Sequence, residues 1–203
     1  MRPEDKVVVP FQYPPTAVAP VRQVRSTLLS ASLRVVHSMG WEARYYAALP
    51  KTLHTEIQQL PAGIWIPVGL AMAHYRACDS MNLTATERDT IGEDVSVRTS
   101  RAFIGTLGKA ASGAGVNPWH FLKSVHRIWG RMMDGGDNAI YEAGPKEALV
   151  VLVGCPLVEI PYFRAGLLAY YRAITRVLSR VVYTREVSEH RKPAGLGFRL
   201  SWV

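Results

Sequence analysis

Residues 135–157 have the sequence GGDNAIYEAGPKEALVVLVGCPL, the most informative part of the chain about its fold. Two runs of strand-forming residues, Asn138–Ala143 and Glu147–Cys155, stand on either side of Gly144 and Pro145, which favour a turn. The second run is continuously apolar over EALVVLV, a pattern typical of a strand that is buried on both faces. The stretch therefore predicts a hairpin at the point where the chain changes from helical to strand periodicity.

The residues after this hairpin predict the rest of a sheet. Pro161 opens a segment with apolar residues at helical spacing, which indicates one amphipathic helix. Val181–Glu189 and Leu196–Val203 alternate between apolar and polar residues, so each predicts a further strand. We therefore expect an α+β fold, in which an N-terminal helical region precedes a four-stranded antiparallel sheet with a helix on one face, in the order β-β-α-β-β.

Upstream of the hairpin, apolar residues recur at helical spacing from Val21 onward. Thr84–Glu87 is a capping box that opens a helix expected to reach Leu107, and Asn117 with Pro118 opens another. Five prolines lie in residues 1–20, which are expected to form an extended arm because proline fixes φ and removes a donor. The expected organisation is an arm over residues 1–20 and a single domain over 21–203, with a helical part (21–136) and a sheet part (137–203).

The composition is that of a globular chain, with 203 residues, 48% hydrophobic and 20% charged. No apolar stretch is long enough to span a membrane and the N-terminus has no signal-peptide pattern, so we expect a cytoplasmic protein. Cys78 and Cys155 are predicted to be buried free thiols, because neither has the spacing of a zinc site. No phosphate-binding loop, nucleophile elbow or kinase signature is present, and we predict that the chain is not an enzyme.

A candidate binding site lies along the apolar face of the helix that begins at Pro118. His126 is placed there among aromatic and sulfur-containing residues, where an imidazole suits an axial haem ligand or a polar anchor in an apolar pocket. The alternative is a core histidine that is satisfied by a neighbouring backbone group. We expect a pocket for a small apolar ligand between this helix and the helix that carries His74. The expected lining residues are His126, Trp119, Trp129, Met133, His74, Tyr75 and Met72.

The net charge of +8 is concentrated near the C-terminus. From Pro161 to Val203 there are eight basic residues and two acidic ones, and Arg172, Arg176 and Arg180 recur at intervals of four residues. Such a row of guanidinium groups can bind carboxylates or phosphates, although it is equally compatible with an ordinary solvated face. The alternative function is therefore an adaptor that binds an acidic protein or nucleic acid through this face.

Three further stretches carry a resemblance to a known family: WIPVGLAMAHYRACDSMNL (65–83), IPYFRAGLLAYYRAITRVL (160–178) and GLGFRLSWV (195–203). Together with residues 135–157, the chain from Arg44 to Val203 resembles the haem-NO-binding-like and vinyl-4-reductase-like ligand-binding superfamily. It looks closest to uncharacterised paralogous bacterial proteins of that type from myxobacteria.

The resemblance implies a non-enzymatic sensory or signalling module that holds a small, often apolar molecule and often forms a homodimer. Haem-sensing members use a proximal histidine with a Tyr-x-Ser-x-Arg motif, and this sequence has no such motif. The cofactor therefore stays unknown, with haem as one candidate, and no metal site is expected.

Overall fold

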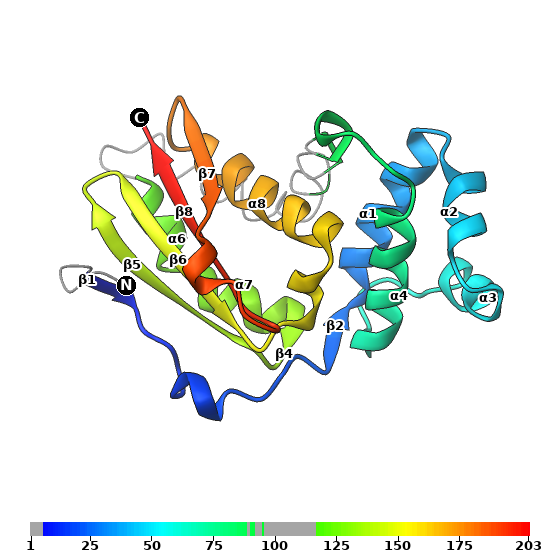
Figure 1. The fold of residues 1–203 in the computed structure, drawn as a ribbon, viewed down its shortest axis with the longest axis horizontal. Helices are drawn as coiled ribbons and strands as arrows, with labels where there is room; N and C mark the ends of the chain where they lie inside the picture. Colours follow the sequence, from blue (N-terminus) through cyan, green and yellow to red (C-terminus); the bar gives the residue numbers. More distant parts are fainter. Residues whose placement is uncertain (1–5, 89, 92–94, 96–116) are drawn as a thin grey trace.

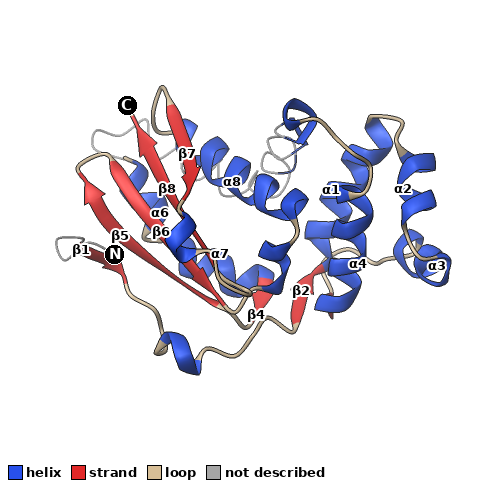
Figure 2. Ribbon diagram, in the orientation of Figure 1, coloured by secondary structure: helices blue, strands red, loops and turns tan. Residues whose placement is uncertain are grey.

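The computed structural model describes residues 6–88, 90, 91, 95 and 117–203. Helices lie at one end of the molecule, and an antiparallel sheet with further helices packed against it lies at the other (Figures 1 and 2). The predicted α+β class is confirmed. No described helix is long and apolar enough to cross a membrane.

The main sheet has five antiparallel strands in the order β1-β5-β6-β8-β7. The predicted hairpin is present, with Ile140 opposite Val150, and the two late strands follow it as expected. The sheet has five strands instead of four because Lys6–Val9 of the arm pairs with the open edge of the hairpin. The strands are β1 (Lys6–Val9), β5 (Asp137–Gly144), β6 (Glu147–Val153), β7 (Val182–Glu186) and β8 (Leu196–Trp202).

Three helices cover one face of this sheet: α6 (Pro118–Leu122), α7 (Val125–Met132) and α8 (Pro161–Arg176). Aromatic rings join the layers, because Tyr171 of α8 packs edge-to-face on Phe121 of α6 and on Phe198 of β8, with centroids 5.8 and 4.9 Å apart. All residues of Ala148–Leu152 are buried, so β6 is covered on both faces as its apolar run predicts.

The helical end contains α1 (Ser26–Ser38), α2 (Glu42–Ala48), α3 (His54–Gln58) and α4 (Val68–Asp79). The predicted capping box is present, since Thr84 donates its amide to Glu87 Oε2 at 2.7 Å and Glu87 donates its amide to Thr84 Oγ1 at 3.2 Å. The expected extension of this helix to Leu107 lies outside the described residues. Single helical turns of the 3₁₀ type are η1 (Pro15–Ala17), η2 (Lys51–Leu53), η3 (Pro156–Glu159) and η4 (Ser188–His190).

Two features of the junction between the ends differ from the prediction. A second antiparallel sheet joins β2 (Gln23–Arg25) to both β3 (Trp65–Pro67) and β4 (Met133–Asp134), and its strands are too short to show a period. The helix expected from Pro118 is divided into α6 and α7, because the Ser124 amide bonds the Phe121 carbonyl three residues back at 2.8 Å. The division into an arm and one domain stays a prediction.

Candidate functional site: an apolar cavity between the helical end and the sheet layer

A cavity of about 140 Å³ lies where the helical end meets the helices that cover the sheet. Its walls come from α1, α4, the helical segment after Thr84, α6, α7, β4 and α8, so both ends of the molecule contribute. Most of the lining atoms are apolar, which favours an apolar occupant. The described lining residues are Leu28, Ser32, Tyr75, Arg88, Ile91, Val95, Phe121, Val125, Ile128, Trp129, Met132, Met133, Tyr162, Phe163, Gly166, Leu167, Tyr170 and Tyr171.

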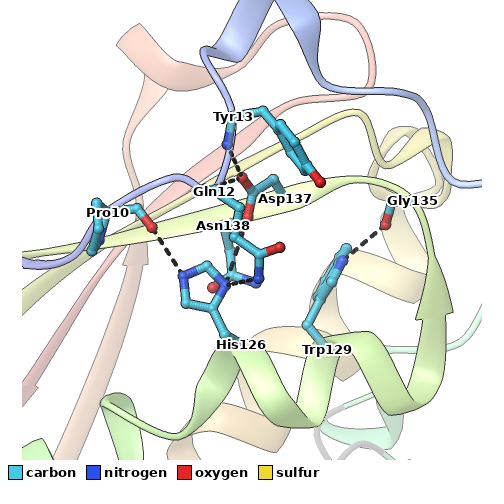
Figure 3. A network of polar contacts seen from close by, with 8 residues as sticks. All are labelled: Pro10, Gln12, Tyr13, His126, Trp129, Gly135, Asp137 and Asn138. Carbon is cyan, nitrogen blue, oxygen red and sulfur yellow. Dashed lines mark hydrogen bonds and ion pairs between the residues drawn. The ribbon is translucent and has the colours of Figure 1, made fainter.

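Three of the expected lining residues, Tyr75, Trp129 and Met133, lie on this cavity. Trp129 donates its indole N–H to the Gly135 carbonyl at 3.0 Å, so the polar atom of the ring is satisfied at the end of α7 (Figure 3). The cavity therefore lies on one side of the helix that the sequence pointed to, although other helices complete it.

His126 points from the same side of α7 as Trp129 (Figure 3), but towards the arm, and it is not among the residues that line the cavity. Its Nε2 is 2.9 Å from the Pro10 carbonyl oxygen, and its Nδ1 is 3.3 Å from Gln12 Nε2 and 3.7 Å from Asp137 Oδ1 (Figure 3). Asp137 is buried and accepts the Gln12 amide at 2.6 Å. The reason is the helix period, since Val125 and Ile128 occupy the cavity side of α7 and leave His126 facing the arm.

The remaining expected lining residues also lie elsewhere. His74 is fully buried with its Nδ1 2.8 Å from the Tyr45 hydroxyl, and burial lowers its pKa to about 3, so the ring is neutral. Trp119 packs edge-to-face on Trp202 at 5.0 Å and donates its Nε1–H to the Pro145 carbonyl. Met72 packs against the core from a partly buried position. Each of these side chains has a packing role away from the cavity.

A chain of neutral polar groups runs through the helical end to the cavity wall. His74 Nε2 is 3.7 Å from Cys78 Sγ, and the side chains of Ser32 and Tyr162 act on the Cys78 thiol to lower its pKa against the larger effect of burial. Ser32 Oγ and the Tyr162 hydroxyl are 3.1 Å apart in turn. Burial raises the pKa of the Cys78 thiol to about 12, so the thiol is protonated and unreactive. This chain brings hydroxyl groups to the cavity but no charge. Cys155 is also free and buried, as predicted for both cysteines.

The described lining contains one cationic residue, Arg88. Its Nη2 is 3.9 Å from Asp79 Oδ1, which is the limit of an ion pair, and its Nε is buried without an acceptor among the described residues. No sequence motif singles out Arg88, because it follows a capping box that explains its surroundings without a ligand.

The arginines proposed for partner binding do not form one row. Arg172 is half-buried and donates from Nη1 to Thr184 Oγ1 at 3.3 Å. Helix α8 ends at Arg176, so Arg180 lies beyond it, where its backbone amide bonds the carbonyl of Val203. Arg176 and Arg180 are both exposed at this end of the molecule.

The described side chains of the cavity do not fit haem. A porphyrin needs far more space than a cavity of about 140 Å³, since an engineered cavity of roughly that size holds a benzene ring. Neither described histidine proposed as a ligand, His74 or His126, reaches the cavity, and no histidine or cysteine is among the described lining residues. Within the same described residues there is no group of three or more histidine, cysteine or acidic side chains that could hold a metal ion.

No protein-family model and no curated protein sequence matches the chain. Its fold is similar to solved structures from three studies. One is "Probing the function of heme distortion in the H-NOX family", with a TM-score of 0.61, 11% identity and coverage of 88% of this chain and 94% of that chain. The second is "Modulating Heme Redox Potential Through Protein-Induced Porphyrin Distortion", with a TM-score of 0.58, 10% identity and coverage of 88% and 99%. The third is an oxygen-binding H-NOX domain related to soluble guanylate cyclases, with a TM-score of 0.58, 10% identity and coverage of 88% and 94%. At these identities the likeness establishes the fold: this chain is similar to H-NOX domains over most of its length.

Proposed function

We propose that this chain is a non-enzymatic sensory or signalling module that binds a small apolar molecule in the cavity between its two ends. The observation that carries the proposal is the cavity itself, which has a volume of about 140 Å³ and a mostly apolar lining. A partly enclosed space with mostly apolar walls and a few polar groups is typical of small-molecule sites. The haem and oxygen ligands named for the H-NOX neighbours support a ligand site in this fold.

The position of the cavity suits a sensor. Leu28 and Tyr75 belong to the helical end, whereas Trp129 and Phe163 belong to the helices that cover the sheet. A ligand that touches both walls binds one relative placement of the two ends better than another, and it shifts the population towards that placement. The more specific likeness to vinyl-4-reductase-like and myxobacterial proteins, and the formation of a homodimer, are parts of the same proposal.

Toluene, a single apolar ring, tests the proposal because it matches the size of the cavity. Thermal unfolding of the purified chain should shift upwards with toluene concentration, since a ligand that binds only the folded state stabilises it by mass action. Native mass spectrometry and an absorbance scan of the same preparation would reveal any molecule that co-purifies. A melting temperature that toluene leaves unchanged, in a preparation that carries no ligand, would refute the proposal.

A second candidate function is an adaptor that binds an acidic protein or nucleic acid through the basic C-terminal face. The exposure of Arg176 and Arg180 favours it. Replacing both residues by glutamate should abolish such an association, and the association should weaken with salt. Binding that survives both the substitution and the salt would exclude this candidate.

A further inference from the structure

Among the described residues that line the cavity, Arg88 has the one buried side-chain polar atom without a hydrogen-bond partner, its Nε. Its Nε is buried and has no acceptor among the described residues, although the side chain as a whole is 29% exposed. A buried donor without an acceptor loses its hydration without gaining a hydrogen bond, so the protein satisfies this guanidinium group only in part. The partial exposure places Arg88 where the cavity meets solvent.

Asp79 satisfies Arg88 only in part. The Nη2–Oδ1 separation is 3.9 Å, beyond the length of a charge-assisted hydrogen bond. The same Asp79 oxygen accepts the amide of Tyr162 at 2.9 Å, which ties it to the first turn of α8. A guanidinium group carries five N–H donors, and the Nη donors that Asp79 does not use, unlike the buried Nε, are accessible to a second acceptor.

We infer, on the basis of the function proposed above, that the cavity takes a ligand of about one aromatic ring with a single carboxylate, and that Arg88 binds this carboxylate. The ring occupies the apolar space beside Phe163 and Trp129, and the carboxylate lies at the solvent end. The hydroxyls of Ser32 and Tyr162 are hydrogen-bonded to each other, so they do not require a second ionic group on the ligand. A cavity of about 140 Å³ sets the size of the ring.

Phenylacetate and phenylacetamide form a matched pair of probes, because they share their shape and differ in charge. Titration calorimetry near pH 7, where the carboxyl group is ionised, should show tighter binding of phenylacetate to the wild-type chain. Arg88→Met keeps an apolar stem but removes the donors, and it should weaken phenylacetate binding by roughly 10- to 150-fold. The affinity for phenylacetamide should fall much less, because its carbonyl oxygen accepts a hydrogen bond but carries no charge. Arg88→Lys keeps the positive charge but cannot donate two parallel hydrogen bonds to a carboxylate. Its affinity for phenylacetate should therefore lie between that of the wild-type chain and that of Arg88→Met.

Circular dichroism of each variant serves as the folding control, and Arg88→Lys provides a second test if Arg88→Met is poorly folded. Equal affinity of the wild-type chain for both probes, or phenylacetate binding that both Arg88 variants retain, would overturn the inference while leaving the proposed function intact. If toluene, phenylacetate and phenylacetamide all fail to bind, the proposed function fails, and this inference fails with it.

Discussion

Filling the cavity should stabilise the protein, and Gly166 in the middle of α8 is the position from which to do so. Gly166 lines the cavity, and a Cβ atom added there would meet no neighbouring atom within 4 Å. Its backbone φ is not among the positive values, so a side chain introduces no strain. The substitution Gly166→Leu therefore directs an isobutyl group into the empty space.

Two contributions determine the size of the effect. Replacing glycine by leucine inside a helix stabilises the folded state by about 1 kcal/mol. Burying the leucine side chain contributes about 1.5–3 kcal/mol, from which about 0.5–1 kcal/mol of lost rotamer entropy is subtracted. The free energy of unfolding should thus rise by about 1.5–3.5 kcal/mol, and the binding of toluene or phenylacetate should be lost.

Urea unfolding followed by circular dichroism measures this change. Gly130→Leu is the matched control, because Gly130 lies in α7, is exposed and also has no atom within 4 Å of an added Cβ. The control gains at most the helix-propensity contribution of about 1 kcal/mol and should still bind both probes. A Gly166→Leu variant that is no more stable than Gly130→Leu, or that still binds phenylacetate, would show that the leucine side chain does not fill the cavity.

Two further predictions concern the histidines that the cavity does not use. The pKa of His74 is about 3 in the folded chain and about 6.5 in the unfolded chain, so the unfolded state binds more protons between these values. The contribution of His74 to the free energy of unfolding is therefore fully present above about pH 6.5 and is lost as the pH falls towards 3. Urea unfolding across this range should show a loss of up to about 1.4 kcal/mol per pH unit that His74→Asn lacks, and equal slopes in the two proteins would contradict the assignment. His126→Ala should speed amide hydrogen exchange in β1 by releasing the Pro10 contact, with phenylacetate affinity unchanged; a loss of affinity would place His126 at the ligand site instead.

The main sheet could be predicted from the sequence because the residue patterns that indicate its strands and turn lie within short segments of the chain. The hairpin around Gly144 has strand-forming residues on both sides, and the continuous apolar run of β6 indicates its central place in the sheet. The pairings of β1 with β5 and of β2 with β4 join residues that lie more than 100 positions apart in the sequence. Strands β1, β2 and β4 have two to four residues, too few to show a period, so no local pattern in the sequence indicates these pairings.

The candidate site was predicted only in part, for reasons of helix geometry. The sequence places Trp129 and Met133 near a pocket, but it does not show that a turn at Ser124 divides the helix and directs His126 towards the arm. The other wall comes from α8, whose apolar face was predicted to be inward without being assigned to a cavity. Arg88 could not be predicted from the sequence, because whether its Nε has an acceptor depends on three-dimensional packing.

The most direct test of a ligand in this cavity follows the methionine methyl groups by NMR. Met132 and Met133 line the cavity, whereas Met39 and Met72 do not, so one spectrum of methyl-labelled protein contains both the reporters and their controls. Titration with phenylacetate should shift the signals of Met132 and Met133 along a single saturable curve and leave those of Met39 and Met72 in place. Signals of Met132 and Met133 that stay unmoved at saturating phenylacetate would contradict the account.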